Sequence, residues 1–119
     1  MIEKYKFVLL GYSNGESLTI TVGEYTFAGP YISPDSLTNQ GGVYAIHCYR
    51  NEKYYLIDVG ESGDIKDRVK NHDRKDCWDS ECSGSLRYSE LLTPRKDQKA
   101  RVAIEKSIRD AYDPPCGKE

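Results

Sequence analysis

Arg68 and His72, in a chain of 119 residues, are side chains of types that can bind an anion or transfer a proton. The spacing of Arg68 and His72, with Ile65 and Val69, follows i, i+3, i+4, i+7. That spacing places a cation and an imidazole on the helix face expected to pack on a sheet. Because arginine is rarely buried without a partner, Arg68 on that face predicts a bound anion.

Two strands and a turn lead into the helix of Arg68. Residues 42–46 and 54–60 are rich in β-branched and aromatic side chains, and the polar residues 50–53 join them. This pattern predicts a β-hairpin whose second strand ends at Gly60. The helix follows after a short turn.

Glu105 lies in a later predicted helix. Leu86 to Leu92 reads as a third strand, and a helix follows from about Arg95 to Tyr112. Thr93 is its expected N-cap, with Pro94 at the first helical position. Its predicted apolar stripe comprises Ala100, Ala103, Ile104, Ile108 and Ala111.

The first third of the chain predicts an added hairpin. Residues 5–12 and 18–22 flank Asn14-Gly15, a pair that favours a tight turn. Residues 27–42 read as a connecting loop, and residues 73–85 as a second, polar loop.

We expect one domain over residues 1–119, because this length suits a single core. Residues 1–40 would form the hairpin extension and connector, and residues 41–117 the main core. The predicted fold class is α+β: a small three-stranded antiparallel sheet flanked by helices, with an added N-terminal β-hairpin.

Charge and composition narrow the partners. A net charge of −2 argues against a protein that coats nucleic acid without selectivity. No stretch is long enough for a membrane span, and Phe7 to Leu10 is too short for a secretory signal. We therefore expect a cytoplasmic protein that does not bind membranes and keeps its four cysteines reduced.

The order of these features resembles the GIY-YIG nuclease superfamily over about residues 40–117. The matching features are Gly42-Val43-Tyr44 on a strand, a strand ending at Gly60, Arg68 eight residues later, then His72 and Glu105. The resemblance implies a three-stranded antiparallel sheet packed against helices. It also implies hydrolysis of nucleic-acid phosphodiesters with one divalent metal ion.

The resemblance assigns a role to four residues. Tyr44 would help to activate water, Arg68 would hold the scissile phosphate, Glu105 would bind the metal, and His72 would assist. The chemistry suits these residue types, because arginine presents forked donors to phosphate oxygens. Mg²⁺ or Mn²⁺ is the expected ion, since Mg²⁺ keeps several waters and needs few protein ligands.

Two departures from the family pattern leave a second function open. Asp58 stands where the second motif has tyrosine, and Cys116-Gly117 stands where an asparagine is expected. Asp58 could add an oxygen ligand to the metal, or mark a site that no longer cleaves. The alternative function is an inactive GIY-YIG-like module that binds nucleic acid or another protein.

Each candidate also has an ordinary structural interpretation. Arg68 could pair with Asp64 one turn earlier, and Glu105 could belong to an ion-pair ladder with Arg101 and Arg109. Tyr44 could be a strand aromatic, and His72 a helix-end residue.

A structural zinc ion is a further alternative. His72, Cys77, Cys82 and Cys116 supply suitable ligand atoms, but they lack the tight Cys-x-x-Cys spacing of strong zinc motifs. The expected macromolecular partner is nucleic acid, DNA rather than RNA. A domain of this size lacks a separate targeting module, so a partner protein or a homodimer would assist.

Overall fold

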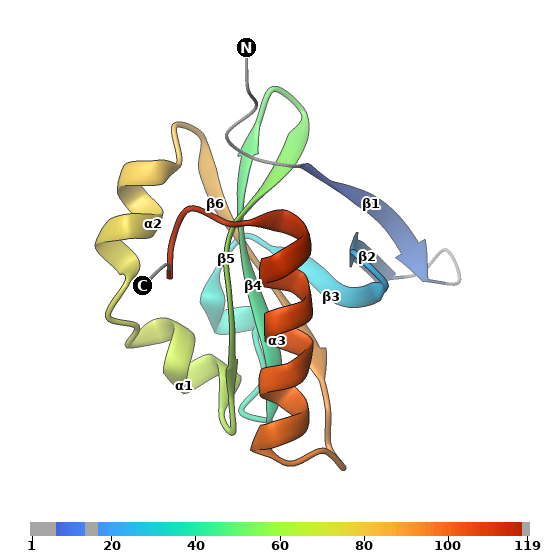
Figure 1. The fold of residues 1–119 in the computed structure, drawn as a ribbon. Coiled ribbons are helices and arrows are strands. Elements are labelled where there is room, and N and C mark those ends of the chain that lie inside the picture. Colours follow the sequence, from blue (N-terminus) through green and yellow to red (C-terminus); the bar gives the residue numbers. More distant parts are fainter. Residues whose placement is uncertain (1–6, 14–16, 118–119) are drawn as a thin grey trace.

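The computed structural model describes residues 7–13 and 17–117 (Figure 1). Its strands are β1 Phe7–Ser13, β2 Ser17–Val22, β3 Tyr25–Tyr31, β4 Gly42–Arg50, β5 Lys53–Ser62 and β6 Ser85–Leu92. Its helices are α1 Ile65–Lys70, α2 Lys75–Glu81 and α3 Gln98–Tyr112, with a 3₁₀ turn, η1, at Pro34–Ser36.

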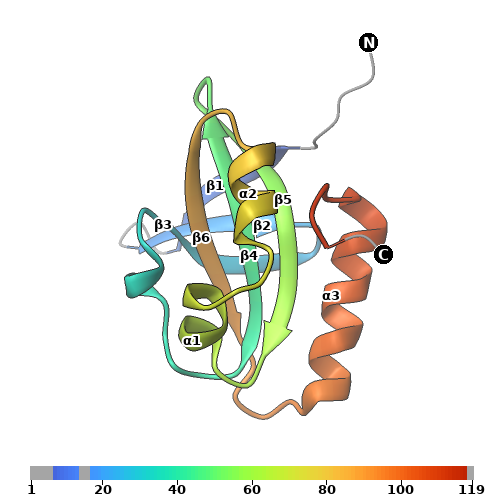
Figure 2. The same cartoon turned by 90° about the vertical axis from the view of Figure 1, so that its left-hand side faces the viewer.

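All neighbouring strands pair antiparallel in the order β1-β2-β3-β6-β4-β5, and a two-residue pairing of β1 with β5 closes the barrel. β4 lies between β5 and β6, with Tyr44 opposite Gly60 on one side and Glu90 on the other. Helices α1 and α2 lie on one side of this central sheet, and α3 runs beside β5 (Figure 2).

The prediction of a three-stranded sheet is wrong. The described residues form six strands in one sheet, within an overall α+β architecture. The difference arises because β3 pairs with both β2 and β6, which joins the N-terminal hairpin to the central strands. No helix in the described part of the chain is long and apolar enough to cross a membrane.

β3 lies largely inside the segment predicted to be a loop. Gly23, with φ of +64°, turns the chain between β2 and β3. Gly29 and Pro30 suggest a loop, yet they fall where the pairing with β6 shifts register between Ala28 and Tyr31. A bulge leaves a residue out of the ladder, so proline and a positive φ are tolerated there.

The central hairpin is confirmed. Asn51 and Glu52 form its turn with φ of 53° and 64°, the backbone that two-residue hairpin loops require. The strands extend beyond their predicted ends, because pairing of β4 with β5 continues from Arg50 opposite Lys53 to Gly42 opposite Ser62.

Two helices differ from prediction. α1 ends at Lys70, so His72 lies beyond the helix whose face it was predicted to share. α3 begins at Gln98, because the Asp97 carboxylate accepts a hydrogen bond from the Ala100 N–H and caps it. Thr93 is not the cap. α2 lies within the segment expected to be a polar loop.

Alternation along β4 divides the buried side chains between two clusters. Tyr44 and Ile46 pack toward α1 and α2, whereas Val43 and Ala45 pack toward β2, β3 and α3. From the predicted α3 stripe only Ile108 is fully buried, with Ile104 partly buried. Ala103 and Ala111 are exposed, because α3 contacts mainly the edge of the sheet at β5.

Candidate active site

Tyr44 crosses over Gly60 on the neighbouring strand. A Cβ placed on Gly60 would lie 2.2 Å from the Tyr44 hydroxyl oxygen, so only glycine leaves room for the phenol. The Tyr44 residue is 1% exposed. Gly60 therefore does not end the strand, which continues to Ser62, and its role is to make space for the Tyr44 side chain.

His72 meets the Tyr44 hydroxyl. Their Nε2 and Oη atoms lie 2.6 Å apart, and the Arg74 backbone N–H donates to His72 Nδ1 at 3.0 Å. Because Nδ1 accepts, the hydrogen-bond network assigns the imidazole proton to Nε2, which donates to the phenol. Burial lowers the pKa of His72 to about 4, aided by the Arg74 and Arg68 charges, so the ring is neutral near pH 7.

Tyr44 is a neutral phenol at the same pH. Burial raises its pKa to about 12, and the nearby Arg74 and Arg68 guanidinium groups only partly oppose this effect. Since His72 donates to the hydroxyl oxygen, the phenol hydrogen remains available for another acceptor. This geometry suits a group that orients water or a phosphate oxygen and does not act as a resting phenolate.

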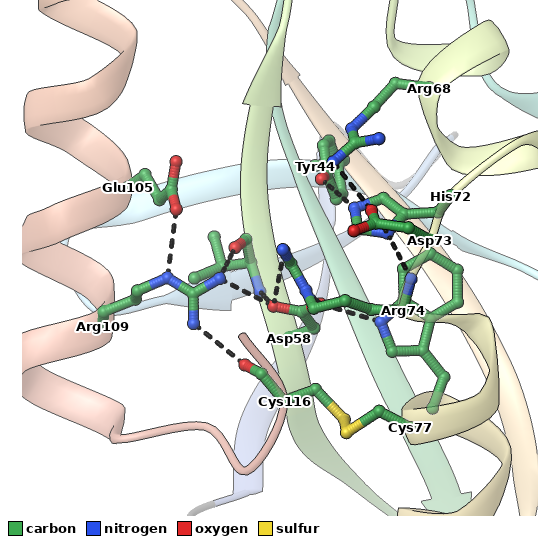
Figure 3. A network of polar contacts seen from close by, with 12 residues as sticks. Tyr44, Asp58, Arg68, His72, Asp73, Arg74, Cys77, Glu105, Arg109 and Cys116 are labelled. Carbon is green, nitrogen blue, oxygen red and sulfur yellow. Dashed lines mark hydrogen bonds and ion pairs between the residues drawn. A yellow bond between two sulfur atoms is a disulfide. The ribbon is translucent and has the colours of Figure 1, made fainter. Parts of the chain in front are cut away.

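Arg68 lies beside this pair, and it does not pair with Asp64, the partner that the sequence offered one turn earlier. Its Nη2 donates to Asp73 Oδ1 at 3.1 Å, and the Arg68 side chain is 40% exposed. Asp64 instead caps α1 by accepting from the Asp67 N–H. The structure thus brings together Tyr44, Arg68 and His72 (Figure 3).

Asp58 is fully buried and bound on both oxygens. Arg109 Nη2 donates to Oδ1 at 2.7 Å, and Arg74 Nε donates to Oδ2 at 2.8 Å. The Trp78 indole N–H donates to Oδ2 at 2.8 Å, and the Val59 N–H donates to Oδ1 at 2.8 Å. These donors occupy the carboxylate, so the structure does not support Asp58 as a metal ligand.

Arg74, Trp78 and Arg109 are the site residues that sequence reasoning missed. A signal was present, because a carboxylate in the middle of an apolar strand must be paired if it is buried. The sequence does not indicate which of its many cations would supply the pair.

Glu105 does not touch the Tyr44 group. Its Oε2 accepts from Arg109 Nε at 3.0 Å, which confirms half of the predicted ladder. Arg109 in turn binds Asp58, so a chain of ion pairs links Glu105 to the buried network. Figure 3 shows Glu105 and Arg109 on the α3 side of β5, with Tyr44 across the strand.

The neighbours of Glu105 on α3 contact β5 next to Gly60. Two arginines, each one helical turn from Glu105, bind residues on either side of Gly60: Arg101 binds Glu61, and Arg109 binds the Val59 carbonyl. Glu105 and the Tyr44 hydroxyl therefore lie at the same level of the strand, on opposite sides of it.

A divalent ion fits Glu105 only in a limited way. Among the described residues, no group of three or more His, Cys, Asp or Glu side chains could hold a metal. Arg109 uses Oε2 of Glu105, and the Glu105 side chain remains 23% exposed. One carboxylate oxygen could therefore hold an ion that keeps most of its waters, as Mg²⁺ commonly does.

The four cysteines are paired, which differs from the reduced state expected. Cys48 bonds to Cys82, and Cys77 bonds to Cys116. Disulfide sulfurs are not thiolates, so the proposed zinc set is not available in this form. Disulfides are typical of oxidising compartments and rare in the cytoplasm. The expected cytoplasmic location stays a prediction, and the disulfides do not favour it.

Both disulfides attach α2 to the rest of the fold. The Cys48 bridge fixes the end of α2 to β4, and the Cys77 bridge fixes its middle to the C-terminal tail. The tail also pairs with the edge of β5, where the Cys116 N–H donates to the Ile57 carbonyl at 3.0 Å. Trp78 on α2 is thereby held against Asp58 and the His72 ring.

No protein-family model, curated protein or solved structure matches this chain. The interpretation of the site therefore depends on its geometry and on the motif resemblance alone.

Proposed function

We propose that this protein hydrolyses nucleic-acid phosphodiester bonds with the aid of a divalent metal ion, in the manner of GIY-YIG nucleases. The observation that carries the proposal is the meeting of Tyr44, His72 and Arg68 over Gly60. These residues come from β4, α1, the segment after α1 and the end of β5. Their convergence supports a shared site for the residues selected from the motif order.

In the proposed chemistry Arg68 stabilises negative charge on the phosphate, and Tyr44 orients the attacking water or a phosphate oxygen. Arg68 would bind the scissile phosphate and stabilise the extra negative charge of the transition state. Tyr44, fixed by the His72 Nε2–H, would direct its hydroxyl at the attacking water or a phosphate oxygen. The divalent ion, when bound, would stabilise the leaving oxygen, and Glu105 is the ligand that the motif order assigns to it, from the α3 side of β5.

The test is a cleavage assay on plasmid, branched and single-stranded DNA, and on RNA, with Mg²⁺ or Mn²⁺. We expect Arg68→Ala to lower the rate by about 100-fold or more, the usual effect of losing a donor to developing charge. Glu105→Gln should lower activity and weaken its dependence on metal concentration, because it removes the proposed ligand's charge.

Matched controls are available on α3 and next to it. Arg95→Ala removes an exposed arginine outside the site. Asp110→Asn changes the exposed i, i+4 pair with Lys106 on the same helix as Glu105. Both should cleave like the wild type. Cleavage that survives both Arg68→Ala and Glu105→Gln would exclude this assignment.

A second candidate function is binding of nucleic acid without cleavage. Two observations favour it: the Tyr44 hydroxyl is buried, and Arg109 binds the carboxylate proposed for the metal. A wild type that is inert on every substrate, yet binds DNA or RNA through Arg68, would support this function in place of hydrolysis.

A further inference from the structure

Asp73 accepts from one of the guanidinium nitrogens of Arg68 through which a phosphate could bind. Its Oδ1 lies 3.1 Å from Arg68 Nη2 and 3.3 Å from His72 Nδ1, beside the Tyr44–His72 pair (Figure 3). The Asp73 side chain is 74% exposed, so it extends over the candidate site from the solvent side. A carboxylate oxygen therefore lies where an oxygen of a bound phosphodiester is expected.

The contact with His72 does not hold Asp73 in place. His72 Nδ1 already accepts from the Arg74 N–H, so it has no hydrogen to offer the carboxylate. The pKa of Asp73 is lowered, first by a hydrogen bond from its own backbone N–H and then by the Arg68 charge. Asp73 is thus an ionised group whose side-chain partner is Arg68.

Asp73 also differs from Asp58, the other carboxylate near this site. Asp58 is buried between two arginines and an indole, and its removal would disturb the core. Asp73 is exposed and follows the end of α1, so it can rotate away without loss of packing. The site therefore contains one displaceable anion, Asp73, and one fixed anion, Asp58.

We propose that Asp73 is an internal competitor for the anion that Arg68 binds. The inference rests on one part of the proposed function, namely that Arg68 binds phosphate. An exposed ion pair is weak, so a ligand that engages the guanidinium through two oxygens displaces it. Asp73 thereby lowers the apparent affinity of Arg68 for phosphate, and for any other anion that must displace it, such as acetate.

The experiment measures binding of inorganic phosphate and acetate at constant ionic strength, from NMR shifts of the backbone amides of residues 68–74. Variants are Asp73→Asn, Arg68→Ala and the double substitution. The control, Asp76→Asn, makes the same charge change at an exposed position three residues away. We expect Asp73→Asn to bind phosphate roughly two- to fivefold more tightly, the range of a weak exposed ion pair.

The gain should depend on Arg68 and be absent from Asp76→Asn. Three results would overturn the inference: no gain in Asp73→Asn, equal tightening in Asp76→Asn, or a gain that persists when Arg68 is alanine. Cleavage is scored separately on the same proteins. An Arg68-dependent gain in a protein that cleaves nothing supports the competitor and rejects hydrolysis. Arg68-dependent cleavage with no gain in Asp73→Asn supports hydrolysis and rejects the competitor.

Discussion

The burial of His47 predicts that the free energy of unfolding depends strongly on pH. It is fully buried on β4, where Nε2 lies 2.7 Å from the Ser89 hydroxyl oxygen. Its Nδ1 has no hydrogen-bond partner in the described part of the chain. Burial lowers the pKa of His47 to about 3, because a protonated ring would carry an unpaired charge inside the barrel.

The sign follows from the unfolded chain, in which histidine titrates near its ordinary value of 6.5. Below that pH the unfolded state takes up a proton that the folded state refuses, so stability falls as the pH falls. The loss attributable to His47 is about 2 kcal/mol at pH 5, relative to neutral pH. His72, with its pKa lowered to about 4, adds a similar loss in the same window.

Urea unfolding between pH 7 and pH 5 measures this effect, with Trp78, the single tryptophan, as the fluorescent probe. Aspartate and glutamate titrate mostly below this range, so imidazoles dominate the slope. The control is His47→Gln, which can keep a bond to Ser89 but does not titrate. It should lose about half of the wild-type slope. An unchanged slope in His47→Gln would refute the assignment.

Two further substitutions test the architecture of the site. Gly60→Ala places a methyl group on the Tyr44 hydroxyl, so we expect a loss of about 1–3 kcal/mol in the free energy of unfolding; Gly63→Ala, in more open space, is the control, and equal stability of the two would contradict the close contact. Asp58→Ala leaves Arg74 and Arg109 without their shared carboxylate and should cost about 3–5 kcal/mol. A thermal melt close to that of the wild type would show that the network is not structural.

The sequence predicted the central hairpin and the antiparallel pairing of β1 with β2, because alternation and turn residues are local signals. The predicted Asn14-Gly15 turn lies outside the described residues. β3 was missed because Gly29-Pro30 favours a loop locally, and its strand pairing comes from β6, far along the chain. α3 was predicted to start too early because Thr93-Pro94 has good cap chemistry. Asp97 provides the actual cap, while Thr93 is buried beside the strand end.

The candidate site was likewise predicted only in part from the sequence. Tyr44, Arg68 and His72 were brought together as the motif order predicted, although His72 arrives from beyond the helix. Asp58 was identified as unusual, but its role depends on two arginines and an indole distant in sequence. Neither hydrophobic periodicity nor charge count can select such partners, because many surface cations look alike in the sequence.

The backbone on the side of β5 that faces away from β4 is bound by other segments, and this affects self-association. Exposed backbone at the side of a sheet is a common starting point for fibrous aggregation, since another chain can add a strand there. In this protein β1, the Cys116 amide and the Arg109 guanidinium already bind that backbone. An incoming strand would have to displace a segment that is covalently cross-linked to α2, so the native fold resists the addition of further strands at this side.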